Sequence, residues 1–186
     1  MKAILAILAF AGSQAVAQTW SVDPSHTSIV FKVDHMGYSN VYGMLEAKDG
    51  TINLNTAKPE TSTFEINVKA DSVNTMAKKR DDHLRNPDFF NVKQFPIIAM
   101  KSKSIKKKSA NEFDVVADLT LHGVTKPVSF VLKQNKTGKD PWGNTRTGAE
   151  TAFKIKRSDF NMTYMSKPGE VGDEIELIVN VEATQK

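Results

Sequence analysis

Most of the chain after residue 17 alternates between hydrophobic and polar residues. In one segment, for example, Phe113, Val115 and Leu119 alternate with Asp114 and Asp118. A period of two places the hydrophobic residues on one face of a β-strand. The same pattern predicts strands near residues 28–34, 41–55, 63–70, 96–106, 113–121, 128–132, 149–155 and 175–181. The domain is therefore predicted to be all-β, with about eight long strands.

Turn signals separate these segments. Gly50 interrupts the segment 41–55 and predicts a bend or bulge. His122-Gly123 and the stretch 138–144, which contains Pro141 and two glycines, are typical of turns. Because these connections are short, neighbouring strands are predicted to pair as antiparallel hairpins.

One segment has a different pattern. Residues 75–86 lack the alternation, contain good helix formers and end immediately before Pro87. A short helix is predicted there. Its stripe at helical spacing contains Met76, Lys79, Arg80, His83 and Leu84.

Each predicted strand has one hydrophobic face that must be buried. Eight antiparallel strands that close into a barrel bury these faces inside and leave no free sheet edge. A sandwich of two sheets is the alternative, because alternation alone does not distinguish the two. The favoured prediction is an eight-stranded antiparallel barrel with a short helix near one end. Its narrow lumen would be wide enough for one slender ligand.

The first 17 residues differ from the rest of the chain. Lys2 precedes an unbroken apolar run over residues 3–11, and Ala15-Val16-Ala17 forms an A-x-A cleavage site. This pattern is typical of a secretory signal peptide, and the run is too short to span a bilayer. We therefore predict a signal peptide at residues 1–17 and one domain at 18–186. The domain is expected to be exported to a bacterial periplasm without a transmembrane anchor.

The amino-acid composition excludes several kinds of functional site. The 186 residues include no cysteine, which excludes disulfides, thiolate metal sites and cysteine nucleophiles. The formal net charge of +4 is small and spread along the chain. The run Lys106-Lys107-Lys108 has no interleaved aromatic residues and is predicted to be the tip of a hairpin. We therefore expect no nucleic-acid partner.

No pattern typical of an active site is present in the sequence. The four histidines, His26, His35, His83 and His122, are scattered and lack the spacing of a helical metal site. There is no nucleophile elbow and no phosphate-binding glycine loop. Asp81-Asp82-His83 is interpreted as a solvated helix face rather than an acid–base group. We expect no catalytic residue, no metal and no cofactor.

One cluster combines aromatic residues with charges. The segment 83–90 contains Leu84, Phe89 and Phe90, and Phe95 follows closely. These residues either cap one end of the barrel and fill its core, or form the mouth of the lumen. In the second case His83 and Arg85 would lie near the polar head of a ligand. The two interpretations are compatible, and both stay open at this point.

Several motifs resemble those of one protein family. They occur in order at residues 20–27, 33–37, 49–52, 82–92, 119–128 and 157–160. The whole domain thereby resembles the YceI family of lipocalin-like, polyisoprenoid-binding periplasmic proteins. Asn161 stands where the family usually has glycine, and Met44 and Met100 stand where other residues are expected.

The resemblance implies a lipocalin-like barrel with an internal apolar tunnel. It implies that the tunnel binds a long isoprenoid or a similar amphiphile, without catalysis. A polyprenyl phosphate and an isoprenoid quinone are both compatible with it, and the family makes a homodimer plausible. The expected partner is thus a long-chain isoprenoid lipid.

Specific residues are predicted for each part of the tunnel. The lining is expected on the inward faces of the strands, at Phe31, Val33, Phe64, Ile66, Val68, Met100, Leu119, Phe153 and Leu177. The mouth is expected at Leu84, Phe89, Phe90 and Phe95. The polar head group is expected to meet His83, Arg85 and Arg157, which suit a phosphate or a quinone carbonyl equally.

Three functions are compatible with these observations. The first is a lipid-binding carrier or scavenger. The second is an enzyme, such as a quinone-linked accessory protein, although no reactive constellation is visible. The third is a stress-related or interaction module whose lumen is packed core. In that case Phe31, Phe64 and Phe153 would touch one another and leave no void.

Overall fold

The computed structural model describes residues 18–186; the predicted signal peptide at 1–17 lies outside the described residues. Nine strands follow in the order β1 (Gln18–Val22), β2 (Ser28–His35), β3 (Ser39–Leu54), β4 (Thr63–Asn74), β5 (Ile97–Lys107), β6 (Glu112–Leu121), β7 (Val124–Lys139), β8 (Thr145–Lys156) and β9 (Val171–Gln185). The helix α1 (Lys78–Leu84) lies between β4 and β5. Short 3-10 helices are η1 (Pro24–His26), η2 (Pro59–Thr61) and η3 (Arg157–Phe160).

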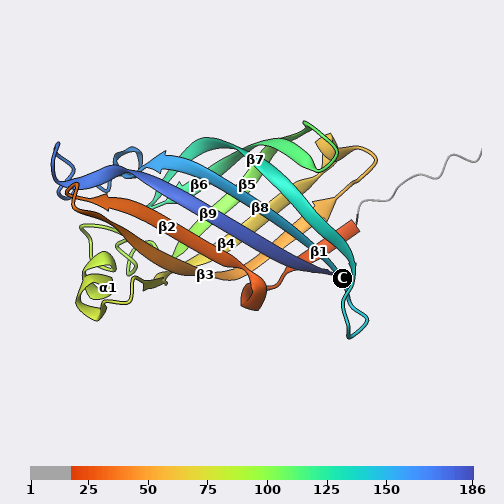
Figure 1. Cartoon of the computed structure of the whole chain (residues 1–186), viewed down its shortest axis with the longest axis horizontal. Helices are drawn as coiled ribbons and strands as arrows, with labels where there is room; N and C mark the ends of the chain where they lie inside the picture. The colour runs from red at the N-terminus through yellow and green to blue at the C-terminus, as the bar shows by residue number, and fades with distance from the viewer. Residues whose placement is uncertain (1–17) are drawn as a thin grey trace, which may run out of the picture.

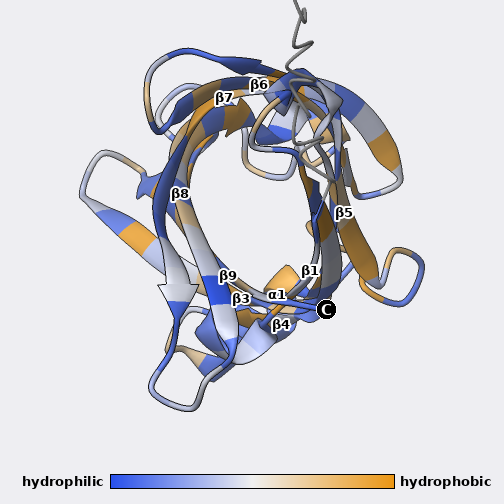
Figure 2. Ribbon diagram, turned by 90° about the vertical axis from the view of Figure 1, so that its right-hand side faces the viewer, coloured by the Kyte–Doolittle hydropathy of each residue, from blue (hydrophilic) through white to orange (hydrophobic). Residues whose placement is uncertain are grey.

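All described strands belong to one closed antiparallel sheet. Their order is β1-β3-β2-β9-β8-β7-β6-β5-β4, and β4 pairs back onto β3. Both β1 and β2 pair with β3 on one side and with β9 on the other. They therefore share one position in the barrel, so the nine strands occupy eight positions. Figure 2 shows this closed ring end-on. The predicted eight-stranded lipocalin-like barrel is confirmed, and the alternative prediction of a two-sheet sandwich is wrong.

The two ends of the barrel differ. At one end, here called the α1 end, lie the β2–β3 turn, α1, the β6–β7 turn and residues 157–170 between β8 and β9 (Figure 1). At the opposite end lie the connections β3–β4, β5–β6 and β7–β8, together with the C-terminus (Figure 1). Helix α1 lies beside β3 and β4 rather than across the whole opening (Figure 2).

Irregularities in two strands keep hydrophobic residues facing inward. In a regular strand, residues that face the same side are separated by an even number of positions. In β3, Leu45 and Ile52 are seven positions apart, yet both face the lumen, because the register shifts between Ala47 and Asp49. A bulge of this kind adds one residue and exchanges the two faces of a strand. In β5 a register shift between Ser102 and Ser104 likewise exchanges the two faces of the strand.

The bulge predicted at Gly50 lies just before it in β3, and Gly50 itself has another role. β3 continues through Gly50, and the register shifts lie just before it. A Cβ atom at this position would lie 2.7 Å from Cγ2 of Val22 and 2.9 Å from the carbonyl oxygen of Glu65. Glycine is therefore required by the close approach of two neighbouring strands, and not by a bend.

The helix is shorter than the predicted segment 75–86. Thr75 is buried and lies outside α1, where its backbone N–H and its hydroxyl donate to Oδ1 of Asp81 at 2.8 and 2.5 Å. These bonds hold the chain in a turn before α1 begins. No helix within residues 18–186 is long and apolar enough to cross a bilayer.

A network around Arg146 joins distant parts of the opposite end. Its Nη1 donates to Oδ2 of Asp23 at 2.7 Å and its Nε to Oδ2 of Asp140 at 2.9 Å. Burial raises the pKa of Asp140, but hydrogen bonds from Arg146 and from Asn144 outweigh this effect and lower it to about 2. The pKa of Asp23 is also lowered, chiefly by hydrogen bonds from Ser25 and Arg146.

This network predicts a pH-dependent contribution to stability. The pKa of Asp140 falls from 3.8 to about 2 on folding, so its carboxylate stabilises the fold fully above pH 3.8. That contribution is lost as the pH falls toward 2. Urea unfolding should therefore show that Arg146→Gln destabilises the protein more at pH 7 than near pH 2. Equal destabilisation at both pH values would contradict this role of the network.

Candidate functional site

The barrel encloses a cavity of about 480 Å³. It runs between the two ends, because its lining includes His83 and Tyr164 at the α1 end and Leu54, Pro59 and Gln134 at the other. The lining in between is almost entirely aliphatic and aromatic. A space of this size and character is typical of a ligand pocket.

Most of the predicted residues face this cavity. Its lining includes Phe31, Val33, Phe64, Ile66, Val68, His83, Leu84, Phe89, Phe90, Met100, Leu119, Phe153, Arg157 and Leu177. Alternation along β2, β4, β5, β6, β8 and β9 accounts for the strand residues in this set. Their role in binding a ligand stays a prediction.

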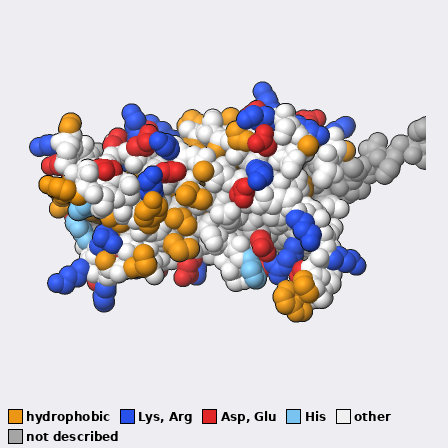
Figure 3. All heavy atoms as spheres, in the orientation of Figure 1, with side chains coloured by type: hydrophobic (Ala, Val, Ile, Leu, Met, Phe, Trp, Pro, Cys, Tyr) orange, Lys and Arg blue, Asp and Glu red, His pale blue; other side chains and the backbone are white. Residues whose placement is uncertain are grey.

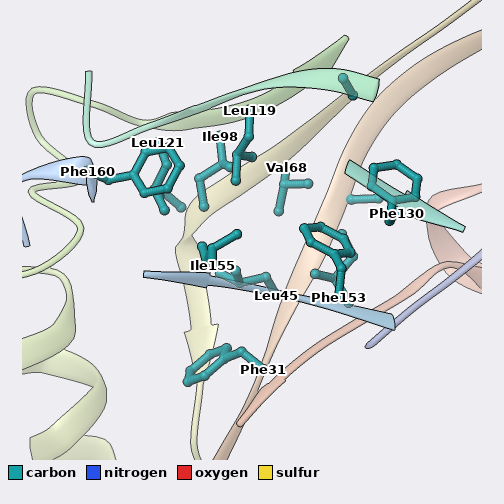
Figure 4. Close-up of a cluster of buried hydrophobic side chains, with 14 of the residues drawn as sticks. Phe31, Leu45, Val68, Ile98, Leu119, Leu121, Phe130, Phe153, Ile155 and Phe160 are labelled. Carbon is teal, nitrogen blue, oxygen red and sulfur yellow. The ribbon is translucent and has the colours of Figure 1, made fainter. Parts of the chain in front are cut away.

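The aromatic side chains do not fill the lumen. Phe153 stacks on Phe130 with ring centroids 4.9 Å apart, and Figure 4 shows Phe31 apart from this pair. Among residues 18–186, no close ring pair joins Phe31, Phe64 and Phe153. The packed-core alternative required these three contacts and no void, so the cavity contradicts it.

The ring of Phe31 can lie over β3 because the residue paired with it on that strand is glycine. Phe31 and Gly43 are directly opposite in the β2–β3 ladder. A Cβ atom at Gly43 would lie 2.2 Å from Cζ of Phe31 and 2.8 Å from Cγ2 of Thr75. The ring thus lies against the wall of the barrel, which leaves the middle of the lumen open.

An aromatic group lies at the α1 end of the cavity. The ring of His83 is edge-on to Phe89 and to Tyr164, with centroids 5.1 Å apart in both pairs. Phe89 and Tyr164 are 5.4 Å apart. The helix supplies His83, the segment after it supplies Phe89, and the β8–β9 connection supplies Tyr164. The segment 83–90 therefore contributes side chains to the cavity lining at the α1 end, and its role as a mouth for a ligand stays a prediction.

Two predicted residues lie outside the cavity lining. The ring of Phe95 packs on the β6–β7 turn, where it is edge-on to His122 at 5.0 Å and fills the space beside Gly123. Arg85 donates from Nε to the carbonyl of Asp71 and from Nη2 to that of Val73, both at 2.8 Å. Both residues hold the segment after α1 against the barrel, and neither lines the cavity as was predicted.

Arg157 lines the cavity, but its N–H groups are already used. The side chain is 3% exposed, and its three nitrogens donate to the carbonyls of Met162, Tyr164, Met165, Val171 and Gly172 at 2.7–2.9 Å. Burial lowers its pKa. Because five carbonyl oxygens accept from the guanidinium, Arg157 organises the β8–β9 connection and has no N–H group left to donate to a head group.

Sequence reasoning missed Arg80 as a residue of the mouth. Arg80 lines the cavity, donates from Nε to Oγ1 of Thr75 at 2.7 Å and from Nη2 to the carbonyl of Thr75 at 2.8 Å. The helical stripe contained the signal, since Arg80, His83 and Leu84 share one face of α1 and all three line the cavity. Tyr164 and Met165 also line it, but they lie in an irregular segment without periodicity.

The fold agrees with comparisons to known proteins. The model of the YceI-like domain matches residues 20–183. The chain belongs to the YceI-like family. Protein YceI of Salmonella arizonae is 39% identical over 184 residues, which cover 98% of this chain and 95% of the relative. The family predicted from the sequence motifs is thereby confirmed.

Solved structures share the YceI-like fold. The YceI protein of Campylobacter jejuni is 31% identical, with a TM-score of 0.71 over 82% of this chain and 90% of that one. BcnA of Burkholderia cenocepacia has a TM-score of 0.75 at 19% identity, covering 88% and 99% of the two chains. A domain from Saccharophagus degradans described as polyisoprenoid-binding has a TM-score of 0.68 at 14% identity, covering 91% and 99%. The last two show likeness of fold alone.

The departure of this YceI-like chain at Asn161 has a local explanation. Asn161 follows η3 and has a φ of 61°, in the left-handed region. Glycine adopts this conformation without strain, and asparagine is among the residues that tolerate it best. Asparagine is therefore compatible with the turn that leads into the Arg157 network.

One cluster in this YceI-like barrel resembles a catalytic triad in composition. Nδ1 of His26 lies 2.9 Å from Oδ2 of Asp23 and 3.1 Å from Oγ of Ser25. In a triad the serine and the carboxylate contact opposite nitrogens of the imidazole. Here both contact the same nitrogen, and Oγ of Ser25 also donates to Asp23 at 2.6 Å. The cluster thus caps η1, and no group of three potential metal ligands occurs within residues 18–186.

Proposed function

We propose that this chain binds a long-chain isoprenoid, or a related amphiphilic lipid, in the lumen of its barrel. A polyprenyl phosphate and an isoprenoid quinone are the leading chemical classes. The observation that carries the proposal is the apolar cavity of about 480 Å³, with an aromatic mouth at one end. The role would be storage or transport without catalysis.

The energetics of burial support a ligand of this kind. Each methylene group moved from water into an apolar lumen contributes about 0.8 kcal/mol. A chain of about four isoprene units would supply well over 10 kcal/mol before the cost of ordering it. The polyisoprenoid-binding description of the Saccharophagus degradans domain, which has the same fold, supports the same class of ligand.

The proposal also includes a periplasmic location and a homodimer. A periplasmic protein could shield an isoprenoid from water between two membranes, and the predicted signal peptide would export it there. For a homodimer, the outer face offers an apolar row in which Met44, Val30, Ile178 and Ala152 are aligned across β3, β2, β9 and β8. Figure 3 shows hydrophobic side chains gathered on this face. The homodimer stays a prediction.

Native mass spectrometry of the protein exported in a bacterial host tests this function. We expect a discrete added mass on the folded chain that organic extraction releases as an isoprenoid. An empty protein should then take up polyprenyl phosphate or isoprenoid quinone when each is supplied separately. An empty protein that binds neither class of lipid would contradict the proposal.

A further inference from the structure

Charge is distributed unevenly along the cavity. Its lining contains four basic side chains, His35, Arg80, His83 and Arg157, and all of them belong to the α1 end. At the opposite end the polar lining is neutral, with Ser62, Gln134 and Thr147 among its members. No aspartate or glutamate within residues 18–186 lines the cavity. A ligand in the lumen therefore meets positive charge at one end only.

Of the two arginines that line the cavity at this end, Arg80 is the one that keeps N–H groups available. All three nitrogens of Arg157 already donate to backbone carbonyls. In Arg80 only Nε and Nη2 donate to groups within residues 18–186, and both bonds go to Thr75. Nη1 makes no hydrogen bond within the described chain, so its N–H groups can donate to a ligand.

Arg80 is held in place before any ligand arrives. Thr75 accepts from Nε of Arg80 through its hydroxyl oxygen, and the same hydroxyl donates to Oδ1 of Asp81 at 2.5 Å. Asp81 and Thr75 are 7% and 2% exposed. The guanidinium is thus fixed by a buried pair, which reduces the entropy cost of binding a head group.

Two acidic side chains near Arg80, Asp82 and Asp88, contact other partners, and Asp81 is linked to Arg80 through the hydroxyl of Thr75. Asp82 accepts from Lys78 at 2.7 Å and from Arg85 at 3.2 Å. Oδ2 of Asp88 lies 3.0 Å from Nε2 of His83. Among residues 18–186, none of these carboxylates forms an ion pair with the guanidinium of Arg80.

We propose that the α1 end binds an anionic head group, such as a phosphate monoester, through Arg80. The inference rests on the proposed function, because it requires an isoprenoid chain in the lumen. A guanidinium forms shorter and stronger hydrogen bonds with a phosphate or carboxylate than with a neutral oxygen. A quinone or an alcohol in the same lumen would gain much less from Arg80.

Matched ligands test the inference on the folded protein. Geranylgeranyl monophosphate and geranylgeraniol have the same chain and differ in the charge of the head, and geranylgeranoic acid distinguishes a carboxylate from a phosphate. Calorimetric titration should show that the wild type prefers the phosphate to the alcohol by about 10-fold to 100-fold. Arg80→Gln should reduce this preference to within about 3-fold, because the charged donor is lost.

Two further variants keep the result interpretable. Lys79→Gln removes the same charge from the neighbouring position of α1, which does not line the cavity, and should leave the preference unchanged. Arg80→Lys retains the charge and should keep much of the preference, even if the bonds to Thr75 are weakened.

The outcomes separate the two proposals. Equal affinity of the wild type for phosphate and alcohol would overturn the anionic head group and leave lipid binding intact. A preference that survives in Arg80→Gln, or that disappears equally in Lys79→Gln, would overturn the role of Arg80. If none of the three ligands binds, the proposed function fails and this inference fails with it.

Discussion

Replacing Leu177 with tryptophan is expected to weaken binding of a long-chain isoprenoid by about 100-fold. Leu177 lies on β9 directly opposite Phe31 on β2 and Phe153 on β8, and all three line the cavity. An indole ring here would occupy the middle of the lumen. If it excludes about four methylene groups, the loss is about 3 kcal/mol of binding free energy.

The adjacent position on the same strand provides the control. Ile178 faces outward, where it is 36% exposed and lies opposite Val30 and Ala152. Ile178→Trp adds the same ring without entering the lumen, so its affinity should match the wild type. Titration with geranylgeranyl monophosphate measures both variants, and circular dichroism checks that both are folded. A folded Leu177→Trp protein with wild-type affinity would exclude the lumen as the binding site.

Replacing Arg157 with methionine is expected to lower the free energy of unfolding by about 3–5 kcal/mol. Methionine has a similar length but donates no hydrogen bond. Five carbonyl oxygens between Met162 and Gly172 would lose their donor. Unsatisfied buried acceptors are costly, so the β8–β9 connection should open locally before the barrel unfolds.

Arg85→Met is the matched comparison for this variant. Arg85 donates to two backbone carbonyls, those of Asp71 and Val73, and its side chain is 33% exposed. Its replacement should cost only about 1–2 kcal/mol. Urea unfolding measures both, and hydrogen exchange should show faster exchange over residues 157–172 in Arg157→Met alone. Similar losses of stability in the two variants would contradict the organising role of Arg157.

The strands and most of the lining could be predicted from the sequence because both depend on local spacing. Phe31 and Val33, or Phe64, Ile66 and Val68, share a face whatever the rest of the chain does. Once the strands close into a barrel, that face must become the lumen. The resemblance to the YceI family was equally readable, since its motifs occur in order along the domain.

The polar end of the site was harder to predict, since a sequence does not say which partners an arginine has. Arg85, Arg157 and Arg80 are all compatible with a head group by residue type. The N–H groups of Arg157 donate to carbonyls as far along the chain as Val171 and Gly172. Arg80 donates to Thr75 from two of its nitrogens, which leaves its third nitrogen available. Phe95 was misplaced for a similar reason, because its contact with Gly123 joins segments far apart in the sequence.

The sequence by itself determined an all-β domain, the inward face of the strands that alternate without a bulge, and the family. Only the tertiary structure decided that the lumen is open and that its positive charge lies at one end. The physical reason is that periodicity acts over a few residues, whereas a void depends on side chains from every strand around the barrel. The direction of Phe31 toward Gly43, for instance, follows from the pairing of β2 with β3.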